Sequence, residues 1–185
     1  MKAHFYLKAI PLGLVMSGVL TVAPAQAAEC ELGPRAQCRG ADLQGQVLQG
    51  LDLSGVDLRG ANLRGVNLGG THLRGANLRG ADAREASFLD ADLRGANFTG
   101  ADLRGADLSN SYLEAAVLNR ARLDGAAFFG AYLGRTQFVG ASLVDVDLSG
   151  VQSNTTDRPR LLRDLRRARL CRTVLPTGRV SNRNC

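Results

Sequence analysis

Residues 91–105 read ADLRG ANFTG ADLRG, and this five-residue unit decides the fold. It runs without a change of register from 41 to 150, as 22 consecutive pentads, and its central residue is Leu or Phe everywhere except at Ala83. A fixed period of this kind is typical of a solenoid, in which each unit buries its apolar face only against its neighbours. The sequence therefore predicts an elongated repeat architecture.

Neither an α-helix nor a flat strand places these central residues on one side. Five residues advance an α-helix by about 500°, well past a full turn, and an odd step along a strand flips every second side chain to the opposite face. Gly closes 15 of the 22 pentads, and each would cost ~1 kcal/mol inside a helix. A backbone that turns a corner in every pentad keeps all the central residues inside, together with the residue two positions earlier.

If each corner turns by about a right angle, four pentads close one coil, and each residue stacks on the one twenty positions later. Ala83 should then leave a gap between Leu63 and Leu103. The residues just before and just after each core residue point outward. Columns of Asp and Arg lie side by side at these outward positions, and we interpret them as lateral charge pairs on a solvated face rather than as a calcium ladder.

The repeated unit Ala-Asp/Asn-Leu-Xaa-Gly resembles the pentapeptide-repeat family over about 110 residues. The resemblance implies an all-β fold, a right-handed quadrilateral β-helix with short N- and C-terminal caps. The ending from Ala168 to Cys185 also resembles the tail of some secreted bacterial members, which carry Met-Pro-Asp-Gly where this chain has Leu-Pro-Thr-Gly at 175–178. Some members of the family resemble duplex DNA in shape and charge and act on DNA gyrase.

The first residues have the composition of a secretory signal. Lys2 and Lys8 precede an apolar run over 9–23, and Ala-Gln-Ala at 25–27 supplies the small residues of a cleavage site. A membrane anchor needs about 20 uninterrupted apolar residues, and Pro and Gly interrupt this shorter run. We expect residues 1–27 to be removed and the mature protein to be exported, as a periplasmic or secreted protein.

The remaining chain divides into three parts. We predict an N-terminal cap over 28–40, the pentapeptide-repeat β-helix over 41–152, and a loop, further pentads and a basic C-terminal cap over 153–185. Leu165, Leu170 and Leu175 resume the five-residue spacing in a new phase. The alternative for 158–169 is a basic amphipathic helix, with Asp157 before it and Pro159 in its first turn.

Export makes disulfides the expected state of the four cysteines, Cys30, Cys38, Cys171 and Cys185. The repeats between the two pairs would separate the ends by roughly 26 Å at ~4.8 Å per coil. Disulfide partners need Cα atoms within ~7 Å. Among the three pairings we therefore favour Cys30 with Cys38 and Cys171 with Cys185.

Catalytic chemistry has little support in the sequence. His72 is the only histidine after residue 27, so no nucleophile, base and orienting acid can be named. The cysteines lack the spacing of a zinc site. We therefore expect no enzyme activity, no metal and no cofactor.

Two surface features suggest partners. In the last two coils, outward positions that are polar elsewhere become apolar or aromatic, which favours contact with a protein partner or self-association; the alternative is that the loop over 152–162 covers them. These positions are Tyr112, Val117, Phe129, Tyr132, Val139 and Val144.

The second feature is charge. Residues 41–152 carry 10 Arg against 11 Asp and 2 Glu, a net −3, whereas 153–185 carry 9 Arg and 2 Asp, a net +7. This charge balance argues against a protein that mimics DNA and acts on gyrase, because such mimicry requires a strongly acidic surface. In our first interpretation the basic segment is a solvated cap. In the second, it contacts an anionic membrane surface. Nucleic-acid binding is disfavoured because the segment contains no aromatic residue that could stack on a base. The candidate anion contacts are Arg158, Arg160, Arg163, Arg166, Arg167, Arg169 and Arg172.

Overall fold

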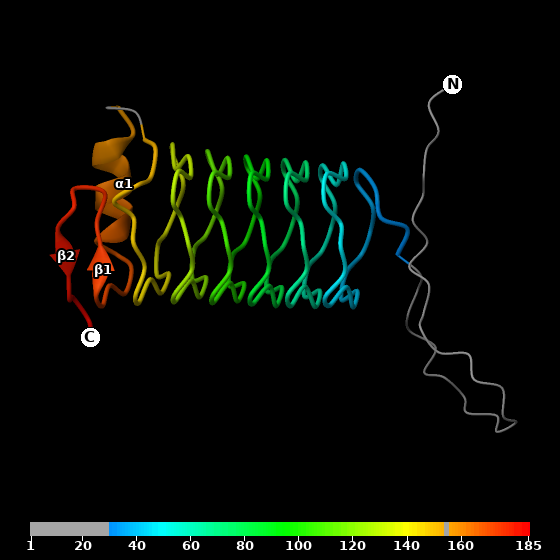
Figure 1. Ribbon diagram of the computed structural model, residues 1–185, viewed down its shortest axis with the longest axis horizontal. Helices are drawn as coiled ribbons and strands as arrows, with labels where there is room; N and C mark the ends of the chain where they lie inside the picture. The colour runs from blue at the N-terminus through cyan, green and yellow to red at the C-terminus, as the bar shows by residue number, and fades with distance from the viewer. Residues whose placement is uncertain (1–29, 154–155) are drawn as a thin grey trace, which may run out of the picture.

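The computed structural model describes residues 30–153 and 156–185, so the expected signal at 1–27 lies outside the described residues. The chain winds into coils that stack along one axis, with the C-terminal elements at one end (Figure 1). Parallel β-bridges join Asp82 to Asp102 and Tyr112 to Tyr132, and the same step of twenty residues recurs along the coils. Four pentads therefore make one coil, as the sequence predicts.

Each pentad is a short extended piece followed by a two-residue turn. The amide of Leu103 donates to the carbonyl of Arg122 in the next coil at 2.7 Å, and the amide of Asp102 donates to Ala81 in the previous one at 2.9 Å. From Gly40 to Asp145, the last residue of each turn has a positive φ, which glycine adopts without steric cost. Asp90 and Asn110 adopt the same conformation with φ of 58° and 55°, because short polar side chains tolerate the left-handed region.

The central residues of the pentads form the buried core. Ala83 is fully buried, and its coil also contains Phe88 and Phe98, whose rings pack edge to face with centroids 5.7 Å apart. Two residues larger than leucine thus accompany the alanine within one coil, which offsets the gap expected at this position.

The coil has four outward faces, which we name A to D, and each repeats every twenty residues. Every face is built from the residue before the core residue and the two residues after it. Face A contains pentads 41–45, 61–65, 81–85, 101–105, 121–125 and 141–145, and face B contains the pentads that follow these, 46–50 through 146–150. Faces C and D continue with 51–55 through 131–135 and 56–60 through 136–140.

The coil begins one pentad earlier than the sequence boundary. Gln37 bridges to Asp57, and Cys38 occupies a core position with 2 % of its surface exposed. The predicted cap over 28–40 is therefore too long: 36–40 is a coil pentad, because cysteine is small and apolar enough to replace leucine at the core position.

The C-terminal end combines both of the alternatives weighed from the sequence. Helix α1 spans Arg158–Leu165 and buries Leu161 and Leu165, so the interpretation of Leu165 as a pentad core residue is wrong. An apolar pair at i and i+4 lies on one helix face, and Pro in the first turn suits a helix start. The pentad pattern then resumes, because Arg169 bridges to Ser142 and Val174 bridges to Asp147.

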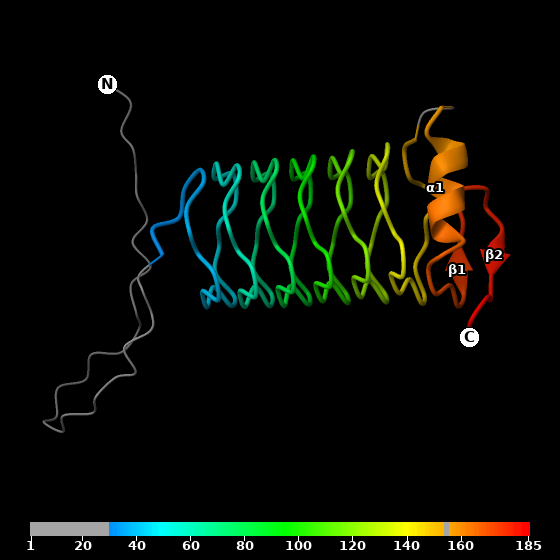
Figure 2. The same cartoon turned by 180° about the vertical axis from the view of Figure 1, so that it is seen from behind.

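Strands β1 (Thr173–Val174) and β2 (Val180–Ser181) form a short antiparallel hairpin beyond the helix. Helix α1 and this hairpin lie across the end of the last coil in both views (Figures 1 and 2). They cover backbone groups that an open coil end would leave unpaired.

Each end of the solenoid carries a disulfide. Cys30 is joined to Cys38 and Cys171 to Cys185, with Cα separations of 5.1 and 4.8 Å, which is the pairing that distances along the coil favour. Within 30–153 and 156–185, no helix has both the length and the apolar character needed to cross a membrane.

Candidate functional site

The six outward residues predicted as a contact surface lie on all four faces. Tyr112 and Tyr132 lie on face C and Phe129 lies on face B at the adjoining corner. Phe129 is 75 % exposed and the two tyrosines are each 41 % exposed. The three valines are half-buried and lie elsewhere: Val117 and Val139 on face D, Val144 on face A. The structure thus brings together three of the six residues.

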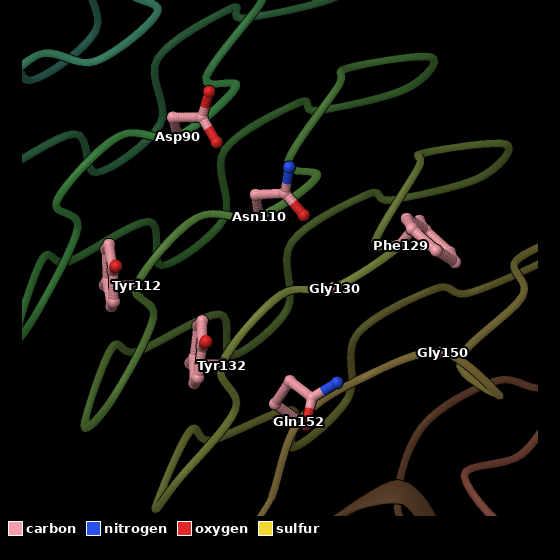
Figure 3. A pocket seen from close by; sticks show the side chains of 8 residues that line it. All are labelled: Asp90, Asn110, Tyr112, Phe129, Gly130, Tyr132, Gly150 and Gln152. Atoms are coloured by element: carbon pink, nitrogen blue, oxygen red, sulfur yellow. The ribbon is translucent and has the colours of Figure 1, made fainter.

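These three aromatic residues surround a hollow at the corner between faces B and C, which we call the notch (Figure 3). Its volume is about 510 Å³. The turn residues of four successive face B pentads form one side, and outward residues of face C form the other. The lining consists of Asp90, Asn110, Tyr112, Phe129, Gly130, Tyr132, Gly150 and Gln152.

The tyrosines form a ladder because they occupy equivalent positions in adjacent coils. Their ring centroids are 5.0 Å apart and the planes differ by 9°. In the preceding coil, the guanidinium of Arg94 lies 5.6 Å from the centroid of Tyr112, and its Nε donates to Oδ1 of Asp92 at 2.8 Å. Arginine, carboxylate and aromatic ring therefore already act together on this face, as cation–π geometry favours.

Glycine keeps the notch open at Gly130 and Gly150, on its C-terminal side (Figure 3). A Cβ at Gly130 would lie 2.2 Å from Oδ1 of Asn110, and a Cβ at Gly150 would lie 3.0 Å from Cδ2 of Phe129. A contact of 2.2 Å is closer than real Cβ atoms come, so a side chain at 130 would displace the amide of Asn110, whereas a side chain at 150 would only press on the ring of Phe129.

Face A shows the lateral charge pairs expected from the sequence. Arg104 donates to Asp102 at 2.7 Å, Arg122 lies 3.5 Å from the same carboxylate, and Arg84 pairs with Asp82. Hydrogen bonds from these arginines hold the pKa of Asp82 and of Asp102 below the usual range, because they stabilise the charged carboxylate. Within the described ranges, no group of three or more His, Cys, Asp or Glu residues could hold a metal ion.

The seven arginines predicted as anion contacts are all exposed on the C-terminal cap. Arg172 pairs with Asp145, and Nε of Arg169 donates to the carbonyl of Asn184 at 3.3 Å. The others occur in or directly after helix α1, so the outer surface of the cap is strongly basic.

Sequence reasoning missed Asp90, Asn110 and Gln152. It followed the switch from polar to apolar residues along the chain, whereas the notch joins residues from different coils. Writing the sequence in rows of twenty residues places Asp90 and Asn110 in one column and Tyr112, Tyr132 and Gln152 two columns further on, with one inward-facing column between them, so this signal was present in the sequence.

Comparison with known proteins gives a consistent picture of the repeats. The sequence model of a family described as pentapeptide repeats (8 copies) matches residues 36–75, 61–100, 71–110, 96–134 and 121–152. None of the curated proteins compared matches the chain.

Several solved structures are similar. QnrB1, a plasmid-mediated fluoroquinolone resistance protein, is 23 % identical, with 71 % of this chain and 84 % of that one covered and a TM-score of 0.45. A pentapeptide repeat protein from the Arabidopsis thaliana thylakoid lumen is 35 % identical, with 66 % and 78 % covered and a TM-score of 0.28. HetL, involved in heterocyst differentiation regulation in a Nostoc cyanobacterium, is 28 % identical, with 80 % and 78 % covered and a TM-score of 0.28.

Proposed function

The chain belongs to the pentapeptide-repeat family, and we propose that it is a non-enzymatic, exported scaffold that mediates contact with another protein or with a second copy of itself. The family implies that the coil is right-handed and quadrilateral. In this proposal the coil fixes outward side chains in columns, and the C-terminal half of those columns carries the contact surface.

The exposed aromatic residues around the notch are the observation that carries the proposal. Phe129, Tyr112 and Tyr132 are attached to a backbone that is hydrogen-bonded to the neighbouring coils. Each aromatic side chain has only two χ angles, so docking a partner on them costs little conformational entropy. Aromatic residues are enriched at protein interfaces, and a group of exposed apolar side chains on one surface often marks one. Within the described residues the ring of Phe129 stays 75 % exposed, which argues against an intramolecular cover at this residue. Gln152, Ser153 and Asp157 of the predicted loop do line a second hollow beside Tyr132.

Cross-linking in the cells that produce the protein tests the proposal without knowledge of the partner. We expect a cross-linked adduct for the wild-type protein and its loss in the double variant Phe129→Asp, Tyr132→Asp, because two charges would have to be buried in the contact. The matched control is Asn77→Asp with Asn97→Asp, which adds two charges on face D. An adduct that persists in the aromatic variant, or that disappears equally in the control, would contradict the proposal.

Export rests on the sequence of 1–27 and on the two disulfides, since disulfides persist in oxidising compartments. Fractionation followed by N-terminal sequencing tests it. We expect the protein outside the cytoplasm with its N-terminus at residue 28. Retention in the cytoplasm with an intact N-terminus would overturn this part of the proposal.

A second candidate function is anionic envelope-surface binding through the cap, favoured by the exposure of all seven arginines. Co-sedimentation with vesicles containing anionic phospholipid should show binding that weakens as salt is raised, because the Debye length falls to ~10 Å at 0.1 M. Neutral vesicles are the control. Equal binding to neutral vesicles, or none to anionic vesicles at low salt, would exclude this function.

DNA mimicry directed at gyrase is the least favoured candidate. Arginines line faces A, C and D, whereas duplex DNA presents negative charge along its whole surface. Inhibition of DNA supercoiling by the purified mature protein would reverse this ranking.

A further inference from the structure

Face B differs from the other three faces in charge. Its six pentads, QVLQG, VNLGG, ASFLD, ADLSN, AAFFG and VDLSG, contain three aspartates and no basic residue. All 10 arginines of residues 41–152 lie on faces A, C and D. We call face B, together with the notch at its corner, the arginine-free face.

The exposed apolar side chains gather on this same surface. Val47, Leu89 and Phe129 are 68 %, 38 % and 75 % exposed, and they occur in every second coil of face B. Tyr112 and Tyr132 border it at the notch. Of the large hydrophobic side chains exposed within the described residues, the single one located elsewhere is Val180, on the C-terminal hairpin. The arginine-free face therefore has the apolar anchors of a docking surface.

The carboxylates of the arginine-free face differ from those of the neighbouring faces in their pairing. Asp92 and Asp102 on the neighbouring faces each pair with arginines. Within 30–153 and 156–185, no arginine lies at ion-pair distance from Asp90, Asp107 or Asp147. Their negative charge is available to a cation supplied from outside.

The notch reproduces the chemistry that already holds an arginine on face C. There, Asp92 accepts hydrogen bonds from Arg94 while the ring of Tyr112 faces the guanidinium. In the notch, Asp90 and Asn110 supply oxygen acceptors, and Phe129 and Tyr132 supply the rings (Figure 3). A planar guanidinium stacks on aromatic rings and binds carboxylates through two parallel hydrogen bonds, and the hollow is large enough to admit one.

The chain itself carries a complementary surface in its C-terminal cap. Residues 153–185 have a net charge of +7, and the arginines of and after helix α1 are exposed. The cap lies at one end of the solenoid (Figure 1), whereas the exposed apolar residues of face B extend back along the coils to Val47. A cap that docks along this face therefore belongs to a second molecule.

We propose that the arginine-free face, with the notch as its arginine-accepting site, docks the arginine-rich C-terminal cap of a second copy of this chain. This inference rests on the contact function proposed above and names the partner surface. Each molecule contributes a face to one neighbour and a cap to another, so the contact is heterologous and open-ended. The attraction between charges makes it sensitive to salt.

Sedimentation velocity of the purified mature protein tests the contact. We expect a weight-average mass that rises with protein concentration at low salt and falls toward the monomer at high salt. L-arginine hydrochloride should dissociate the assembly more than L-lysine hydrochloride at the same ionic strength, because lysine lacks the planar guanidinium. A wild-type protein that stays monomeric at low salt, or an assembly equally sensitive to both amino acids, would overturn the proposal.

Two variants that each remove one side of the contact make the test specific. The face variant carries Asp90→Asn, Asp107→Asn and Phe129→Ser, and the cap variant carries Arg163→Glu, Arg166→Glu and Arg167→Glu. All these positions are at least partly exposed, and Asn tolerates the positive φ at 90. The matched control is again Asn77→Asp with Asn97→Asp.

Each variant alone should be monomeric, while their equimolar mixture should form a 1:1 dimer that does not grow further. The dimer arises because the intact cap of one variant docks on the intact face of the other. A mixture that sediments as two monomers, a cap variant that still associates, or a control that dissociates would each overturn the proposal. Cells that still yield a cross-linked adduct with another protein would then leave the contact function standing without self-association.

Discussion

Truncating Leu103 to alanine should destabilise the protein more than truncating Leu123, although the two residues occupy the same core column one coil apart. Both are fully buried. The coil of Leu103 contains only leucines at its other core positions, and Leu103 stacks directly on Ala83, so the variant would place two alanines on top of each other. Little remains nearby to fill the resulting hole.

The coil of Leu123 can collapse instead. It contains Phe128 and Phe138, whose ring centroids are 6.4 Å apart. In the coil that naturally holds Ala83, the equivalent rings of Phe88 and Phe98 are 5.7 Å apart. Phe128 and Phe138 can therefore move into the closer arrangement that Phe88 and Phe98 already adopt beside Ala83.

Measured costs of Leu→Ala substitutions span roughly 2.7–5.0 kcal/mol and depend on how far the site can collapse. We expect about 4–5 kcal/mol for Leu103→Ala and about 3 kcal/mol for Leu123→Ala. Urea unfolding with intact disulfides measures both, provided that the m-value is unchanged. Equal costs, or a larger cost at Leu123, would refute the idea that the paired phenylalanines compensate for a missing leucine.

Three further outcomes follow from the turns, the charge pairs and the caps. Gly130→Ala should destabilise the protein by ~1 kcal/mol or more, and Gly100→Ala by less. Both glycines have φ of 70°, but only a Cβ added at Gly130 would meet a neighbouring atom. Urea unfolding measures the two free energies, and equal costs would contradict this reasoning. Asp57→Asn should cost roughly 1 kcal/mol near pH 7 and less near pH 2, because hydrogen bonds from two arginines depress the pKa of Asp57. The stabilisation is complete above the unfolded-state pKa of ~3.9 and declines as pH falls from there toward the lower folded-state pKa. A cost that does not vary with pH would count against this pairing. Replacing Cys171 and Cys185 by Ser should raise hydrogen exchange in 173–181 and leave 61–120 unchanged, since repeats contact only their neighbours; loss of protection throughout the coil would show that the cap controls the whole fold.

The period of five was sufficient to predict the coil because every pentad repeats the same pattern of one buried central residue followed by a turn. A central Leu must be buried, and the turn must follow it at the same distance, so the register of residue 43 predicts that of residue 148. Ala83 illustrates the limit of this reasoning. The expected gap ignores Phe88 and Phe98, which lie in the same coil, since packing within a coil depends on all four of its core residues.

The surface was harder to predict because contiguity on a solenoid depends on rows of twenty rather than on neighbours in sequence. Val117 and Phe129 are close along the chain but lie on opposite faces, whereas Asp90 and Gln152 are far apart and line one notch. The end of the solenoid posed a different problem. Leu165 satisfies both a five-residue spacing with Leu170 and a helical spacing with Leu161, so local pattern alone could not choose between them.

Photocross-linking from position 129 tests the central claim most directly. Phe129 of the mature protein is replaced by photoreactive benzoylphenylalanine, the variant is mixed at low salt with isotope-labelled wild-type chain, and the adducts are mapped by mass spectrometry. The account predicts adducts between position 129 of the unlabelled chain and residues 156–172 of the labelled one. Adducts confined to one chain, or adducts with the coil surface at 41–150 of the labelled chain, would contradict it.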